Sequence, residues 1–472
     1  MKKFLFPYEL IKKDSDILIF GAGYVGRQYL QAIEKTGYCN VKYVLDNNYK
    51  ELSDAKLPLG VKVVAPEFAM QCKNYSAVLI AVKYNDMATK IKRQLLILGV
   101  ENDKIIFTKE NAVEFIEDNG AETLRIAFLC SGGLGDDIAG VLLPKGMREI
   151  VPKNLVLDYY CRTYQLLENL DFIDNAYHIS QFTGNDKYDI VLTGHRAFEI
   201  EKLALTKVKR ISEKLYQYFV DILDIYENIL NFEDISTSHR FLKLCEILNK
   251  SFLEQCNIHD ILPFNRNTKL QLNLSIDIEN YIKSLNLKNK QFITICENDS
   301  SKNNYDIRFW HPQNFLALCD MINKDFPDKI IIWIGNSITT DISSKLDNPR
   351  IIDLRGKTSL TELAALLKCA ELHIGLESGP IHLRHFLDGG TSVCLFGPTS
   401  ISTLAYDENI NIRSSKYPCS ENGCMLVHKK FPHGACLISP KTDYSACMEA
   451  LSPQEVHKCI YDYLNAQNGA KF

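Results

Sequence analysis

The sequence predicts an α/β protein made of three successive units, each a parallel sheet flanked by helices. Short apolar runs typical of buried strands alternate along the chain with stretches of helical spacing. Such alternation favours parallel strands joined by right-handed crossovers. The length of 472 residues is sufficient for two or three domains, each with its own hydrophobic core.

The composition is that of a globular protein with no bulk affinity for polyanions. Hydrophobic residues make up 46% of the chain and the formal net charge is −4, so we expect no nucleic-acid partner. The apolar run near Met1 is too short for a signal peptide, and no run approaches the ~18 apolar residues of a membrane span. We therefore expect a cytoplasmic protein without a transmembrane segment, in which most of the fifteen cysteines are buried thiols.

Residues 1–118 form the first predicted unit, a small Rossmann-like domain. A buried strand run is followed at once by Gly21, Gly23 and Gly26 and then by a helical stretch. The next strand run ends at Asp46, about 20 residues after Gly26, where an acid can bond a ribose hydroxyl. The pattern predicts a nucleotide-binding domain. The alternative, a domain that has kept its turn and lost its ligand, stays open.

The second and third predicted units are residues 124–285 and 286–472, joined to the first by a polar segment. In the second unit, strand runs occur at 125–130, 154–158 and 188–192, with a long helical region at about 196–256. In the third unit, strands are expected at 292–296, 330–335 and 351–354, with a fourth that ends at Gly375 and a fifth at 393–396. Helices are expected at 360–368 and 452–464. Two such halves in tandem indicate a ligand site between them, beyond the carboxyl ends of their strands.

The start of one helix in the third unit has features that suit a diphosphate. Ser378 is a favourable N-cap, Gly379 allows a ligand to approach the backbone, and Pro380 fits the first helical turn. Such a helix start presents N–H groups and the positive end of the helix dipole to an anion. An ordinary capped helix is the alternative, and the choice between the two depends on the neighbouring motifs.

Four motifs in residues 124–472 together resemble glycosyltransferase family 9, the ADP-heptose:lipopolysaccharide heptosyltransferases and the related autotransporter heptosyltransferases. The first is Gly135-Asp136 in a glycine-rich turn with Pro144 downstream, and the second is the segment 308–312, Arg-Phe-Trp-His-Pro. The third is the segment 353–367, which begins Asp-Leu-Arg-Gly-Lys-Thr-Ser-Leu. The fourth combines the stretch 370–383 with Phe-Gly-Pro-Thr at 396–399.

This resemblance implies a GT-B fold, in which two Rossmann-like domains face each other and the second holds the sugar donor. Residues 124–285 would then be the acceptor-side domain, and residues 286–472 the donor-binding domain. It also implies an inverting reaction with no metal at the reacting carbon. The N-terminal domain is not part of the usual family architecture.

The resemblance also assigns roles to single residues. Asp136 would be the general base that takes the acceptor proton, with Asp137 a weaker candidate that caps the following helix. The residues expected to bind the donor are Arg308, Glu377, Ser378, Gly379, His382 and Thr399. Of these, Arg308 and the helix N–H groups would stabilise the leaving diphosphate. Glu377 stands where the family usually has Asp, which lengthens the reach of the carboxylate toward the donor sugar by one methylene. His311 is inserted between Trp310 and Pro312.

Cysteines are concentrated near the C-terminus, and Cys419, Cys424, Cys436 and Cys447 could bind a metal ion through four thiolates. The resembling protein heptosyltransferases carry a four-cysteine iron finger in this region. We expect a structural Zn or Fe in segment 419–447, with His428 and His433 as alternative ligands. Buried thiols without a metal are the alternative.

The combined interpretation is an inverting glycosyltransferase that moves a sugar, heptose by resemblance, from a nucleotide-sugar donor such as ADP-heptose to a hydroxyl. The acceptor would be a bacterial glycan or a protein. Peripheral attachment to the bacterial inner membrane and assembly into a homo-oligomer stay open. Two other functions remain as alternatives: an NAD(P)-dependent oxidoreductase based on the N-terminal domain, and a non-catalytic nucleotide-sugar-binding protein.

Overall fold

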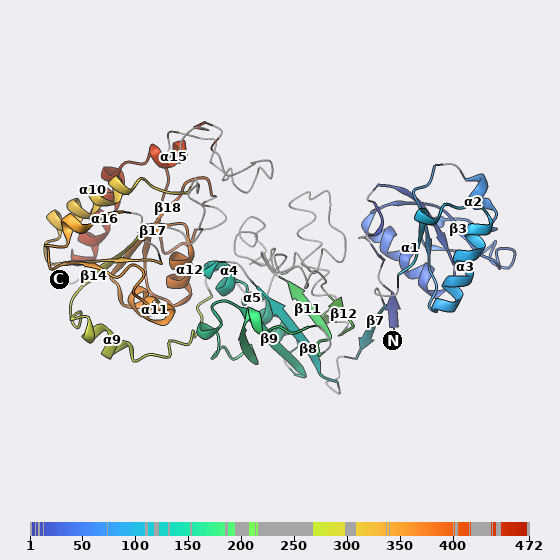
Figure 1. Ribbon diagram of the computed structural model, residues 1–472, viewed down its shortest axis with the longest axis horizontal. Coiled ribbons are helices and arrows are strands. Elements are labelled where there is room, and N and C mark those ends of the chain that lie inside the picture. Colours follow the sequence, from blue (N-terminus) through green and yellow to red (C-terminus); the bar gives the residue numbers. More distant parts are fainter. Residues whose placement is uncertain are drawn as a thin grey trace.

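The protein, a computed structural model, consists of three lobes in a row, with the N-terminal lobe set apart from the other two (Figure 1). The structure describes residues 2–4, 6–7, 10–12, 14–72, 74–108, 112–117, 122–130, 133–151, 153–184, 187–193, 207–212, 214–215, 268–297, 308–336, 338, 340–399, 401, 405–414, 416, 436, 438–439 and 445–469. Most of the helical region predicted at 196–256 lies outside these residues.

The N-terminal lobe is a five-stranded parallel sheet with the strand order β4-β3-β2-β5-β6. Its strands are β2 (Asp16–Phe20), β3 (Asn40–Leu45), β4 (Val63–Val64), β5 (Ala77–Ile80) and β6 (Ile105–Ile106). Its helices are α1 (Tyr24–Thr36), α2 (Phe68–Gln71) and α3 (Asn85–Ile97). Strand β2 is buried along most of its length and separates two hydrophobic clusters, as expected for a central strand covered on both faces.

The middle lobe has a sheet with the order β10-β9-β8-β11-β12, parallel except for the pair β11 and β12. Its strands are β8 (Leu124–Leu129), β9 (Leu155–Cys161), β10 (Asn175–His178), β11 (Ile190–Thr193) and β12 (Lys207–Val208). Helices α4 (Leu134–Ala139) and α5 (Leu142–Ile150) follow β8 and pack on one face of the sheet.

The C-terminal lobe has a six-stranded parallel sheet with the order β16-β15-β14-β17-β18-β19. Its strands are β14 (Phe292–Cys296), β15 (Ile330–Ile334), β16 (Ile351–Asp353), β17 (Leu372–Leu376), β18 (Ser392–Leu395) and β19 (Ile410–Ile412). Its helices are α9 (Ile278–Ser284), α10 (Pro312–Asp325), α11 (Leu360–Cys369), α12 (Gly379–Phe386), α15 (Ala446–Glu449) and α16 (Pro453–Gly469).

All three sheets share one topology. In each sheet the first strand of the lobe lies in the middle, the next two lie on one side of it, and the fourth and fifth lie on the other. This is the Rossmann order, and ligands bind it at the carboxyl ends of the first and fourth strands, where the order reverses. The predicted α/β class, with a Rossmann-like domain ahead of two facing Rossmann-like domains in the GT-B arrangement, is confirmed.

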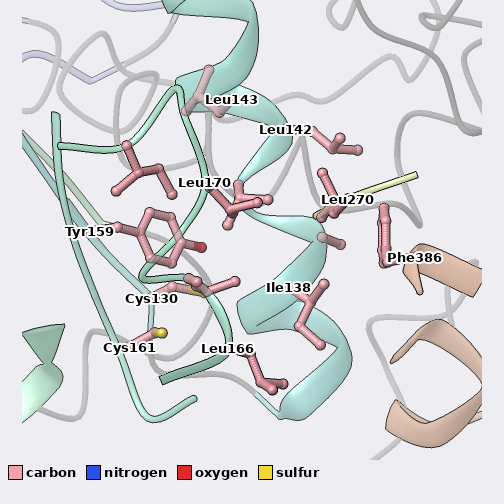
Figure 2. Close-up of a cluster of buried hydrophobic side chains, with 14 of the residues drawn as sticks. Cys130, Ile138, Leu142, Leu143, Tyr159, Cys161, Leu166, Leu170, Leu270 and Phe386 are labelled. Atoms are coloured by element: carbon pink, nitrogen blue, oxygen red, sulfur yellow. The ribbon is translucent and has the colours of Figure 1, made fainter. Parts of the chain in front are cut away.

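The middle and C-terminal lobes share a hydrophobic core. Leu270, in the segment between them, and Phe386 of α12 lie beside α4 and α5 and pack in one cluster with Ile138 and Leu142 (Figure 2). On the far side of α4, the ring of Tyr159 lies beneath the helix, and its hydroxyl donates a hydrogen bond to the carbonyl of Asp137 over 3.0 Å. Helix α4 is therefore held between its own sheet and the C-terminal lobe.

A fourth, three-stranded sheet links the N-terminal lobe to the middle one. It has the order β1-β7-β13, in which β1 (Lys2–Phe4) pairs antiparallel and β13 (Arg210–Ser212) pairs parallel with β7 (Ala112–Ile116). Arg210 also forms ion pairs with Glu122, in the connecting segment, and with Asp189, at 2.7 Å each. The sequence did not predict this sheet.

Within the part of the chain that the structure describes, no helix combines the length and the apolarity that a membrane span requires.

Candidate active site

The turn after β17 places a charged residue at the start of α12. Glu377 follows the strand directly, and α12 begins at Gly379 with Pro380 in its first turn. Ser378 is the N-cap residue of this helix, as predicted, with an extended backbone. Its side chain makes no capping hydrogen bond, and its hydroxyl donates to the carbonyl of Leu376 over 3.2 Å.

Glu377 connects two of the predicted donor-binding side chains. Its Oε1 lies 3.1 Å from Nε2 of His382, one turn into α12, and its Oε2 lies 3.9 Å from Nη1 of Arg308. Glu377 and His382 are buried, while the Arg308 side chain is one-fifth exposed. Arg308 enters from the segment before α10, whose N-cap is the inserted His311. Two nitrogen donors therefore converge on one carboxylate at the switch point of the C-terminal sheet.

Helix α4 of the middle lobe touches this group through two glycines. A Cβ atom on Gly135 would lie 2.5 Å from Cδ2 of His382, and one on Gly379 would lie 2.8 Å from Cβ of Leu134. Real Cβ atoms do not approach other atoms this closely, so both positions require glycine in the present packing. The fold thus brings the turn of Asp136 and the turn of Ser378 together (Figure 1).

Asp136 lies at the start of α4 and is partly exposed. Its Oδ2 accepts the backbone N–H of Gly133 over 2.9 Å, which fixes the side chain as part of the N-terminal cap. Asp136 follows Gly135, whose backbone packs against the ring of His382. The role of Asp136 as the general base stays a prediction.

Asp137 is fully buried and does not cap the helix, contrary to prediction. Its Oδ2 accepts the N–H groups of Arg162 and Thr163 and the hydroxyl of Thr163, at 3.0 to 3.2 Å. Burial raises the pKa of this carboxyl to about 7, because desolvation outweighs the three hydrogen bonds that favour the ionised form. Asp137 attaches α4 to the end of β9, and its burial sets it apart from Asp136.

Thr399 lies in the loop after β18 and is buried, and its Oγ1 has no hydrogen-bond partner among the described residues. Its carbonyl accepts a hydrogen bond from the guanidinium of Arg413. A buried hydroxyl without a partner is uncommon and is compatible with a ligand contact.

The glycine loop of the N-terminal lobe has the geometry that the motif predicts. Gly21 has a positive φ of 118°, and a Cβ on Gly26 would lie 1.9 Å from the carbonyl oxygen of Gly21, so both positions need glycine. A Cβ on Gly23, the N-cap of α1, would meet no atom within 4 Å. Asp46 accepts the N–H of Ala22 and of Asn48 over 2.8 Å each, so it also holds the loop in place.

The predicted metal site falls largely outside the described residues, which include Cys436 and Cys447 but not Cys419, Cys424, His428 or His433. Cys447 is buried in the core of the C-terminal lobe, with its sulfur 3.1 Å from the hydroxyl of Ser445. No three His, Cys, Asp or Glu side chains gather as a metal site within the described part of the chain.

Sequence reasoning missed Tyr406, whose hydroxyl lies 3.0 Å from Nδ1 of His382. The residue is buried in the loop after β18, 24 positions from His382 in the sequence. No spacing or motif connects the two residues in the sequence. The only local sign was an aromatic residue in a loop otherwise rich in polar side chains.

Comparison with known proteins finds a similarity in the C-terminal part of the chain. Residues 264–429 match the sequence model of glycosyltransferase family 9 (heptosyltransferase). A curated relative, lipopolysaccharide heptosyltransferase 1 of Campylobacter coli, is 34% identical over 134 residues, which are 26% of this chain and 36% of the relative. The match thus spans about a third of the relative's length.

Several solved structures of glycosyltransferases are similar to the chain at low sequence identity. Escherichia coli ADP-heptose lipopolysaccharide heptosyltransferase II is 11% identical, with 73% of this chain and 100% of that chain covered and a TM-score of 0.41. The family 9 glycosyltransferase of Veillonella parvula is 16% identical, with 73% and 98% covered and a TM-score of 0.45. The iron-containing dodecameric glycosyltransferase TibC of enterotoxigenic E. coli is 12% identical, with 75% and 79% covered and a TM-score of 0.47.

Proposed function

We propose that this protein transfers heptose from ADP-heptose to an acceptor hydroxyl with inversion at the anomeric carbon. The observation that carries the proposal is the contact between α4 and α12. This contact supports the assignment, because Asp136 belongs to the turn of α4 that packs against His382, which with Arg308 lies against Glu377, and residues 264–429 match the family 9 model. A base and a set of diphosphate-binding donors on facing domains are what an inverting transfer requires.

In this mechanism Asp136 accepts the proton of the acceptor hydroxyl as its oxygen forms a bond to the anomeric carbon. The bond from that carbon to the diphosphate breaks on the opposite side, and ADP leaves with the electron pair. The N–H groups at the start of α12, together with Arg308 and Nε2–H of His382, stabilise the charge that develops on the diphosphate. Arg308 and His382 both exchange Glu377 for the diphosphate, which leaves Glu377 to accept hydrogen bonds from sugar hydroxyls. No step in this scheme uses a metal.

The structural metal is part of the proposal and belongs to segment 419–447. Four cysteine thiolates have the donor chemistry of a closed tetrahedral Zn or Fe site, with no position left for catalysis. Cys436 and Cys447 would supply two of the ligands, and Cys419 and Cys424 the others. TibC, which is described as iron-containing, shows that such an ion occurs in another heptosyltransferase.

We place the reaction in the bacterial cytoplasm, with a glycan or a protein as the acceptor and a homo-oligomer as a further expectation. No disulfide joins any of the eleven cysteines that the structure describes, which fits a reducing compartment. TibC is described as a dodecamer in complex with ADP-D-β-D-heptose, which gives both the oligomer and the donor a precedent in another protein.

The N-terminal lobe is proposed to bind a nucleotide independently of the transfer site. The specific observation is the open space at Gly23, beside the start of the 13-residue helix α1 and at the switch point of its sheet. If this lobe serves an NAD(P)-dependent oxidoreductase, NADH fluorescence should change on titration with the protein. If nothing binds, the oxidoreductase alternative is refuted.

The transfer proposal is tested with nucleotide and nucleotide-sugar binding followed by isothermal titration. We expect ADP and ADP-heptose to bind more tightly than the UDP and GDP compounds. A preference for UDP or GDP would remove heptose from the proposal. Asp136→Asn should bind ADP within about twofold of wild type yet lose transfer by about 10²-fold or more, because it removes the base without touching the diphosphate. Unchanged transfer in this variant would refute the assignment of the base.

A further inference from the structure

The buried hydroxyl of Tyr406 touches the ring of His382 on the side opposite Glu377. We propose that Tyr406 is a positioning residue that orients His382 so that its Nε2–H is presented to the donor diphosphate. This inference rests on the proposed function, and it concerns a residue that none of the four sequence motifs contains. Tyr406 acts through His382 and touches neither the sugar nor the nucleotide.

Tyr406 is held rigidly against α12 by its ring. The rings of Tyr406 and His385 stack with centroids 3.4 Å apart and planes within 10° of parallel, and Phe386 packs edge-on against the same ring at 6.4 Å. The ring of His382 lies edge-on to it at 5.7 Å. Since only 1% of Tyr406 is exposed, its hydroxyl has little freedom to leave Nδ1 of His382.

The two partners of His382 determine where its protons lie. A carboxylate only accepts hydrogen bonds, so Nε2, 3.1 Å from Glu377, carries a hydrogen. The Tyr406 hydroxyl can donate to Nδ1 when the imidazole is neutral and accept from it when the imidazole is charged. Tyr406 therefore satisfies Nδ1 in either state and leaves Nε2–H to donate to Glu377 until the donor diphosphate replaces this carboxylate as its acceptor.

A third contact prevents the ring from moving toward the middle lobe. The Cα of Gly135 lies so close to the Cδ2 edge of His382 that no side chain would fit between them. Tyr406, Glu377 and Gly135 thus confine the imidazole on three sides. Without the Tyr406 hydroxyl, a buried Nδ1 loses its partner, and ring orientations that direct Nε2 away from the diphosphate become accessible.

The test is Tyr406→Phe, which keeps the stacked ring and removes only the hydroxyl. ADP and adenosine binding are measured by isothermal titration. The matched control is Tyr38→Phe, which removes a buried hydroxyl that donates to the carbonyl of Ile11 in the N-terminal lobe. We expect Tyr406→Phe to weaken ADP binding about tenfold, the effect of losing one well-aimed hydrogen bond to a charged group. Adenosine binding and the control variant should stay within twofold of wild type.

A double-mutant cycle separates positioning from a general structural role. In a His382→Ala background, Tyr406→Phe should cause no further loss of ADP affinity, because its effect passes through the missing imidazole. Nitrogen-15 NMR of labelled histidines is the second measurement, and one of the eleven histidines should change its ring resonances in Tyr406→Phe. An additive cycle, equal losses for ADP and adenosine, or unchanged histidine resonances would each overturn the inference. Absence of ADP binding in wild type would instead overturn the proposed function, and the inference with it.

Discussion

Replacing Asp137 by Asn should change how the stability of the protein depends on pH. The side chain is fully buried, and its Oδ2 accepts three hydrogen bonds, from the Arg162 N–H and from the N–H and hydroxyl of Thr163. Oδ1 has no partner among the described residues. An amide oxygen can accept the same three bonds, so Asp137→Asn keeps the attachment of α4 to β9 and removes only the ability to ionise.

The size of the effect follows from the raised pKa of Asp137. Between pH 4 and pH 7 the unfolded chain has lost this proton, while the folded chain, with a pKa of about 7, still holds it. The folded state then binds more protons than the unfolded state, so the free energy of unfolding falls as the pH rises. The gap between the ordinary aspartate pKa of 3.8 and about 7 amounts to about 4 kcal/mol above pH 7, at about 1.4 kcal/mol per pH unit. About 3 kcal/mol of this is lost between pH 5 and pH 8.

The measurement is denaturant-dependent hydrogen exchange with mass spectrometry, on peptides that cover α4 and β9. Such peptides report the middle lobe alone, which matters because a chain of several domains need not unfold in one step. The free energy of unfolding of Asp137→Asn minus that of wild type should be about 3 kcal/mol larger at pH 8 than at pH 5. ADP binding should not change. If the two proteins differed in free energy of unfolding by the same amount at both pH values, the assignment of a proton to buried Asp137 would be refuted.

Three other predictions concern packing, stability and the metal. Gly135→Ala places a methyl group 2.5 Å from His382 and should weaken ADP binding, whereas Gly133→Ala in the same turn, with 3.7 Å of clearance, should not; equal titration curves for the two variants would contradict the packing argument. Arg384→Met should lower the free energy of unfolding of the C-terminal lobe by about 3 kcal/mol, since the buried guanidinium donates to carbonyls at the end of α11 and in the turn after α12. Fluorescence of the two tryptophans, both in this lobe, follows its unfolding in denaturant, and an unchanged unfolding midpoint would contradict the prediction. Wild-type protein should contain about one Zn or Fe ion per chain, and Cys419→Ser should contain less, as measured by mass spectrometry of the metal content. If wild-type protein purified under anaerobic conditions contained neither metal, the proposed site would be excluded.

The sequence predicted the strands and turns of the three sheets because their signals are local. An apolar run followed by glycine and a helical stretch fixes a strand, its carboxyl end and the next helix without reference to distant residues. The turn at Gly21 and the start of α12 were found this way. The shared strand order then follows from short, right-handed connections.

What could not be predicted depends on contacts between distant parts of the chain. The short strands β1, β7 and β13 have little pattern of their own and exist because they pair with one another. Asp136 and Asp137 are chemically identical neighbours, and only the 100° turn of a helix between them decides which one is buried. The same limit applies to Ser378 and Tyr406, because the hydrogen-bond partner of each hydroxyl depends on which groups the fold brings near it.

The pairing of β7 with β13 has a consequence for how the chain assembles during translation. Almost a hundred residues separate the two strands, so the edge of β7 that will receive β13 stays bare until the ribosome has produced most of the middle lobe. Bare strand edges attract other chains, and nascent protein is exposed to that hazard for the whole interval. The same pairing means that cutting the chain after residue 118 would leave β13 without its neighbour, so an excised C-terminal fragment should aggregate more readily than its well-packed lobes would lead one to expect.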